Sequence, residues 1–199
     1  MDDKLTSKRT DRKVLITEIA INKVPYIKYH GLTDAENKLL YDMSVAVLTI
    51  AREKNDSNEV SITVSLTDAG TDLSMIEYGV CLGTEHTVDI LSDSQSFHLI
   101  MSASECAVAV LHNHPSTQTL SLEDISFLLR YASIRFMLVV TNQGIIHYLC
   151  KEADFSFETA RCLFNECVAD ITPNSPTKDV YYAGLKFLSR CSEVGLYYR

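Results

Sequence analysis

The chain has 199 residues, a formal net charge of −8 and 46% hydrophobic residues, a composition typical of one globular domain rather than a disordered or fibrous chain. An acidic protein repels phosphate backbones and the sequence forms no basic patch, so we expect no direct nucleic-acid binding. No apolar run is long enough to span a bilayer, and the polar start lacks the apolar core of a secretory signal, so the expected location is the cytoplasm.

The N-terminal part of the sequence predicts a tail, an extended segment and a helix. Residues 1–13 are highly charged and predict a flexible tail. Residues 13–27, KVLITEIAINKVPYI, alternate apolar and polar side chains and predict an extended segment interrupted at Pro25. Thr33 and Glu36 have the spacing of a capping box, and apolar residues follow at helical intervals, so a helix is predicted to about Lys54.

The middle of the sequence predicts strands and one short helix. Residues 59–66, EVSITVSL, alternate strictly and predict a half-buried strand. After a turn at 68–70, residues 76–82 form a second apolar stretch, and residues 94–103 predict a short helix. Residues 107–111, AVAVL, are apolar on both faces, which indicates a central strand covered on both sides.

The C-terminal half predicts a helix over residues 121–132, a buried strand over 135–140, a turn at 142–144 and another strand over 145–150. Two helices separated by ITPNSP are predicted between residues 155 and 199. We therefore expect one domain over residues 14–154 and a helical extension over 155–199 that packs on it.

The stretch from His112 to Asp124, HNHPSTQTLSLED, predicts a metal site at the end of the central strand. Two histidines two positions apart on an extended segment point to the same side, so both imidazoles can bind one ion, and Asp124 can supply a third ligand. Three protein ligands leave a fourth position for water, as in catalytic zinc sites, and a nearby carboxylate could take the proton of that water. Ser121 and Asp124 also form a capping box that requires no metal, and the two roles can coexist.

These residues resemble a known signature. HNHPS followed by SxxD is similar to the JAMM metallopeptidase motif of the JAB/MPN superfamily, and the HNHPS opening is most similar to its RadC-like bacterial branch. The resemblance implies an α/β, cytidine-deaminase-like fold with a curved central sheet flanked by helices. It also implies a Zn²⁺ ion bound by His112, His114 and Asp124, with Glu59 as the base that works through the metal-bound water. Ser121 would then stabilise the oxyanion.

The resemblance covers residues 59–150, about half of the chain. Glu59 matches the distant glutamate because it opens a predicted strand and precedes His112 by 53 positions. Glu77 and Glu85 remain alternatives for that role. The segment between His114 and Ser121 is one residue shorter than the family's usual pattern, which leaves open how Asp124 approaches the ion.

The predicted function is zinc-dependent hydrolysis of a peptide or isopeptide bond in a protein or peptide substrate. One alternative is a non-catalytic MPN-like interaction or scaffold protein. The other is a RadC-like protein associated with DNA repair or mobile elements. The presence or absence of a tightly bound metal separates the hydrolase from the scaffold.

Overall fold

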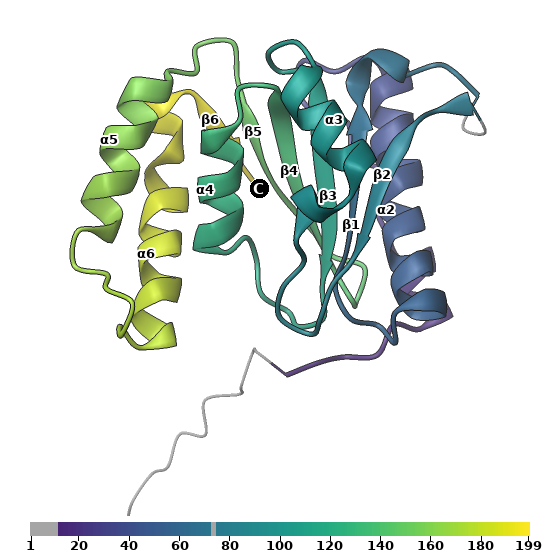
Figure 1. The fold of residues 1–199 in the computed structure, drawn as a ribbon, viewed down its shortest axis with the longest axis horizontal. Helices are drawn as coiled ribbons and strands as arrows, with labels where there is room; N and C mark the ends of the chain where they lie inside the picture. Colours follow the sequence, from purple (N-terminus) through teal and green to yellow (C-terminus); the bar gives the residue numbers. More distant parts are fainter. Residues whose placement is uncertain (1–11, 73–74) are drawn as a thin grey trace, which may run out of the picture.

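The computed structural model describes residues 12–72 and 75–199. Within them, one six-stranded sheet is flanked by helices (Figure 1), so the predicted mixed α/β class is confirmed. The strands are β1 (Val60–Ser65), β2 (Tyr78–Leu82), β3 (Val108–His114), β4 (Ile134–Thr141), β5 (Ile146–Lys151) and β6 (Leu196–Tyr198). The helices are α1 (Glu18–Asn22), α2 (Asp34–Lys54), α3 (Ser94–Ser102), α4 (Leu122–Arg130), α5 (Phe157–Val168) and α6 (Thr177–Arg190).

The sheet is open and mixed, with strand order β2-β1-β3-β4-β5-β6. Only the pair β3 and β4 is parallel, and α4 forms the connection between these two strands. Their C-terminal ends therefore lie side by side, where His114 pairs with Thr141. This edge of an α/β sheet is a common position for functional groups.

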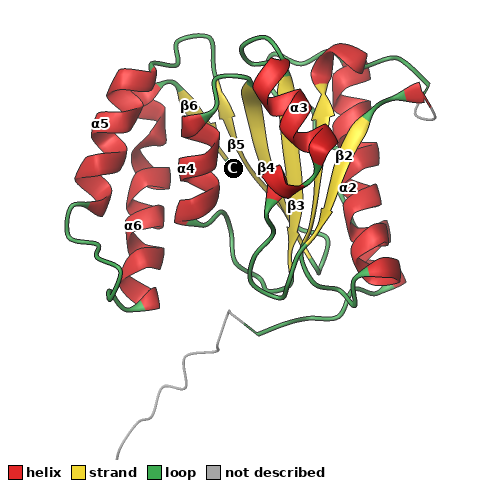
Figure 2. Ribbon diagram, viewed as in Figure 1, coloured by secondary structure: helices red, strands yellow, loops and turns green. Residues whose placement is uncertain are grey.

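Helices lie on both sides of the sheet (Figure 2), and a separate hydrophobic cluster covers each of its faces. The first joins α2 to alternate residues of the central strands, such as Ile62 and Leu111. The second joins Val108 and Val110 of β3 to α4 and to the C-terminal helices. Because side chains alternate along a strand, His112 and His114 continue the row of Val108 and Val110 and point toward the side of α4.

Most predicted elements are confirmed, and the start of α2 shows why the sequence predicted it well. Thr33 Oγ1 accepts a hydrogen bond from the backbone N–H of Glu36 at 3.2 Å, and the Glu36 carboxylate accepts one from the backbone N–H of Thr33 at 2.7 Å. This capping box satisfies two free N–H groups at the helix start.

The N-terminal segment departs from the prediction. Residues 1–11 of the predicted tail lie outside the described residues. Lys13, the last residue of that predicted tail, donates a hydrogen bond to Asn58 Oδ1 at 2.7 Å. The prediction of continuous extended chain over residues 13–27 is wrong at α1. Thr17 caps this short helix by accepting from the N–H of Ala20 at 3.2 Å, a local interaction that outweighs the alternating pattern.

Two further predictions need correction. The strand β1 was predicted to be half-buried, but all six of its residues are buried. The reason is that α3 covers the side that carries Ser61 and Thr63. The C-terminal extension is not entirely helical, because residues 196–198 form β6 and pair with β5. A three-residue strand is too short to give a readable alternation.

Candidate metal centre

Two histidines lie at the C-terminal end of β3 and point to the same face of the sheet. His112 and His114 are both buried, with 2% and 8% of their surface exposed. Their Nε2 atoms lie 3.0 Å apart. The sequence predicted that these imidazoles point to the same side, and their positions follow from the two-residue period of the strand.

Asp124 approaches both histidines from the first turn of α4. Its Oδ1 lies 3.1 Å from Nε2 of His112, and its Oδ2 lies 3.5 Å from Nε2 of His114. The shortened segment after His114 therefore still brings the carboxylate to the imidazoles. One ligand atom from each of the three residues lies within 4.8 Å of the others, and this is the only group of metal-ligating side chains of this kind within residues 12–72 and 75–199.

The capping box of α4 fixes the Asp124 carboxylate. Oδ2 accepts hydrogen bonds from the backbone N–H and the hydroxyl of Ser121 at 2.7 and 2.8 Å, while Ser121 Oγ accepts from the N–H of Asp124 at 3.1 Å. The cap and the candidate ligand therefore coexist in one residue. The hydroxyl proton of Ser121 is directed to Asp124, so donation to a substrate oxyanion would require this hydroxyl to turn.

The charges of the three groups are strongly coupled. Burial opposes ionisation of Asp124, but the adjacent His112 and His114 hold the pKa of its carboxyl well below the ordinary value. Burial also opposes protonation of His114, but its hydrogen bond to Asp124 and the charge of that carboxylate outweigh burial and raise its pKa. The carboxylate is therefore ionised at neutral pH, as a metal ligand must be.

The second ring nitrogens of the two histidines have different surroundings. Nδ1 of His114 donates to the backbone carbonyl of Gln118 at 3.2 Å, so in the neutral ring Nε2 carries the lone pair that a metal ion would need. Nδ1 of His112 is buried and has no hydrogen-bond partner among the described residues. Ser61 is paired directly opposite His112 on β1, and its buried hydroxyl is likewise without a partner there.

Glu59 lies beside the three groups without being one of them. The pairing of Ser61 with His112 places Glu59, two residues earlier, on the same face of the sheet at the level of His114. The side chain is 7% exposed, and burial raises the pKa of its carboxyl although His112 and His114 act in the opposite direction. A buried carboxyl with a raised pKa, close to candidate ligands but outside their set, has the properties of a proton acceptor.

The two alternative glutamates occupy different surroundings. Glu77 is exposed and its carboxylate accepts a hydrogen bond from Gln95 at 3.1 Å, away from the histidines. Glu85 lies in a loop that borders Glu59, because the N–H of Glu59 donates to the carbonyl of Thr84 at 2.9 Å. In the same loop, His86 acts electrostatically on the Glu59 carboxyl. The polar loop therefore flanks the site, and Glu59 is the most buried of the three carboxylates.

Asn113 is a buried structural residue beside the site that the sequence patterns did not single out. It lies between the histidines, is fully buried, and points to the opposite face of β3. Its Oδ1 accepts from the N–H of Val60 at 2.7 Å, and its Nδ2 donates to the carbonyl of Asn58 at 3.1 Å. The amide thus holds both neighbours of Glu59 against β3. A polar residue within an otherwise apolar buried strand was the available signal.

No protein-family model, curated protein or solved structure matches the chain. Of the helices in the described part of the chain, none is both long and apolar enough to cross a membrane. An inference of function therefore rests on the geometry of the site, where His112, His114 and Asp124 form a buried group that could hold a metal ion.

Proposed function

We propose that the chain is a zinc-dependent hydrolase with a JAB/MPN-like fold that cleaves peptide or isopeptide bonds by a JAMM-type mechanism. The observation that carries the proposal is the convergence of His112, His114 and Asp124 at the end of a central strand, with Glu59 buried on the same face. The resemblance of the HNHPS and SxxD segments to the JAMM signature supports the choice of reaction.

The donor set and its spacing favour zinc. Two imidazoles and one carboxylate form a typical catalytic zinc set that leaves one position for water. Ligand atoms held about 2.0–2.1 Å from a tetrahedral ion lie about 3.3 Å from one another. The two Nε2 atoms lie 3.0 Å apart, and the two carboxylate oxygens of Asp124 lie 3.1 Å from His112 and 3.5 Å from His114. With one ligand atom from each residue, the set lies within 4.8 Å, so the side chains would move closer together around a zinc ion.

The residues around the ligands have distinct roles in this proposal. Bound zinc would polarise the scissile carbonyl and lower the pKa of its water toward about 7. Glu59 would act as the proton acceptor and later as the donor to the leaving amine, a role suited to a buried carboxyl with a raised pKa. Ser121 would stabilise the developing negative charge on the substrate oxygen if its hydroxyl turned away from Asp124.

The metal is tested by elemental analysis of the purified protein after dialysis against zinc. We expect about one zinc per chain, which is lost in His112→Ala because an imidazole ligand is removed. His30→Ala is the matched control, since His30 is exposed and its Nδ1 lies 2.9 Å from a carboxylate oxygen of Glu152, outside the candidate ligand set. If the parent protein holds no zinc, the hydrolase is excluded and the scaffold alternative takes its place.

The reaction is tested with the zinc-loaded protein and a fluorogenic peptide library. Glu59→Gln is expected to retain zinc and lose hydrolysis by at least about 100-fold, because the amide cannot accept the proton. Glu77→Gln, which alters an exposed carboxylate, should hydrolyse as the parent does. Unchanged hydrolysis in Glu59→Gln would show that another group is the base.

A further inference from the structure

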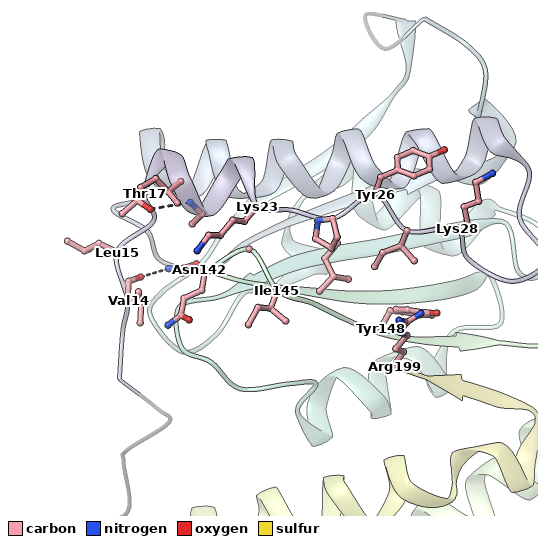
Figure 3. Close-up of a pocket in the computed structure, with 17 residues that line it drawn as sticks. Val14, Leu15, Thr17, Lys23, Tyr26, Lys28, Asn142, Ile145, Tyr148 and Arg199 are labelled. Atoms are coloured by element: carbon pink, nitrogen blue, oxygen red, sulfur yellow. Dashed lines mark hydrogen bonds between the residues drawn. The ribbon is translucent and has the colours of Figure 1, made fainter.

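A groove of about 1050 Å³ lies along the open end of β5, between that strand and the N-terminal segment that includes α1 (Figure 3). One end is formed by Val14 and Asn142, where Asn142 Nδ2 donates to the carbonyl of Val14 at 2.7 Å. The other end is formed by Lys28, Tyr148 and Arg199. None of the candidate metal ligands lines this groove.

Large apolar side chains are exposed around the groove. Leu15 and Ile19 are 63% and 67% exposed on the side of α1. Tyr26 and Ile145 are 48% and 49% exposed farther along it. Single exposed apolar residues are common on proteins, but a set of them around one concave surface is typical of a binding site.

The groove also borders the edge of β5 at Ile146 and Tyr148, which are 8% and 3% exposed. Tyr148 exchanges two backbone hydrogen bonds with Arg199, at 2.9 and 3.1 Å. The N–H and C=O groups of successive residues point to opposite edges of a strand, so those of Ile146 point to the same edge as those of Tyr148. Ile146 lies beyond the part of β5 that pairs with β6 and Arg199. There, among the described residues, the N–H and C=O of Ile146 have no backbone partner. An unpaired edge of this kind can accept a further strand.

The charge of the groove is opposite to that of the whole protein. Lys23, Lys28 and Arg199 line it, and no acidic side chain of the described residues does, although the net charge of the chain is −8. Asp34 lies 3.5 Å from the Lys28 ammonium, but both side chains are more than 70% exposed, so this ion pair is weak. A free α-carboxylate on Arg199 would offset the guanidinium charge of that residue. Lys23 and Lys28 would then supply the net positive charge of the groove.

We propose that this groove binds an extended, acidic polypeptide segment of a partner protein, which adds to the sheet as a strand beside β5. Ile146 supplies backbone pairing, the exposed apolar residues receive alternate side chains of the segment, and the lysines attract its carboxylates. This binding does not depend on zinc or on hydrolysis, so it can be present or absent whatever the outcome at the metal centre.

The test is fluorescence anisotropy with a labelled peptide of about eight residues, a typical strand length, in which Val or Ile alternates with Glu or Asp. We expect saturable binding to the metal-free protein that weakens as salt is added. In Lys23→Glu combined with Lys28→Glu, binding should weaken about tenfold, which two reversed exposed charges can produce. The control carries Lys178→Glu and Lys186→Glu on α6, which give the same change in net charge away from the groove.

Two peptide variants keep the proposal falsifiable if a protein variant folds poorly. A peptide with Lys in place of every Glu and Asp should not bind, because the groove is cationic. N-methylation of alternate amides should abolish binding when it blocks the edge that faces β5 and should be tolerated on the other edge. Equal binding of the acidic and basic peptides, or equal effects of methylation on both edges, overturns the proposal. So does sedimentation showing a dimer that the Lys23→Glu and Lys28→Glu changes dissociate, because the occupant would then be a second copy of the chain.

Discussion

Asn113 and Asn142 join two loops to the central strand through one buried side-chain hydrogen bond. Nδ2 of Asn113 donates to Oδ1 of Asn142 at 2.8 Å, and Asn142 Nδ2 donates in turn to the carbonyl of Ser57 at 2.8 Å. The backbone N–H of Asn142 donates to the carbonyl of His114 at 2.9 Å. These bonds connect the end of β3, the turn after β4 and the segment that carries Glu59.

Asn113→Ala is therefore expected to lower the free energy of unfolding by about 3 kcal/mol, because it leaves buried backbone groups of Val60 and Asn58 without partners. Urea denaturation of the metal-free protein measures the change. Asn165→Ala, at an exposed position of α5, should alter the stability by less than about 0.5 kcal/mol. Equal stabilities of the two variants would contradict the structural role of Asn113.

The two capping boxes give a matched test of the role of Ser121. Ser121→Ala and Thr33→Ala each remove a helix cap and should each lower the free energy of unfolding by about 1 kcal/mol. Only Ser121→Ala should also weaken zinc binding, by about tenfold, because it removes the hydroxyl that orients Asp124. Competition with a chelator measures the affinity. Equal zinc affinities in the two variants would show that the cap does not support the ligand.

The unpartnered Nδ1 of His112 leads to a prediction for Ser61. Directly paired residues on neighbouring strands have Cβ atoms about 5 Å apart, so a small shift lets Ser61 Oγ accept from this nitrogen when Nε2 binds zinc. Ser61→Ala should weaken zinc binding about tenfold with little effect on the metal-free protein, since the hydroxyl has no partner among the described residues. Thr63→Val removes a similarly buried, unpartnered hydroxyl and should leave zinc affinity unchanged.

The pKa of His114 predicts opposite effects of pH on the stability of the metal-free protein and on zinc binding. Because this pKa is raised, protonated His114 stabilises the metal-free protein below about pH 6.5, and that contribution is lost as the pH rises through the folded-state pKa. Zinc requires neutral imidazole, so its affinity should increase over the same range.

Urea denaturation and chelator competition across this pH range provide the measurements. Burial and the charge of His114 lower the pKa of His147. The contribution of His147 to the stability is therefore complete above about pH 6.5 and is lost as the pH falls through its folded-state pKa. The two histidines thus affect the stability in separate pH ranges. In His114→Gln the loss of stability at higher pH should disappear. Its persistence in that variant would assign it to another group.

Periodicity and capping residues predicted most of the fold because they are local signals. The central strand was recognised from AVAVL, and α2 and α4 from their capping boxes. The same local signals predicted that His112, His114 and Asp124 converge, since all three lie on one strand and the next helix. Burial of the polar face of β1 was not predictable, because it depends on α3, which follows some thirty residues later. The roles of Asn113 and Ser61 also depend on pairing between distant segments.

The parallel pairing of β3 with β4 has a consequence for how the site is assembled. All three candidate ligands lie within the strand and the crossover helix that follows it, a continuous stretch of thirteen residues from 112 to 124. Glu59 arrives separately, immediately before β1, which pairs with β3 from about fifty residues away. The capacity to capture an ion thus resides in one short module, whereas the capacity to use it requires the long-range half of the sheet to close. Under the proposed mechanism, partial opening at the β1 side would leave metal binding intact and abolish hydrolysis.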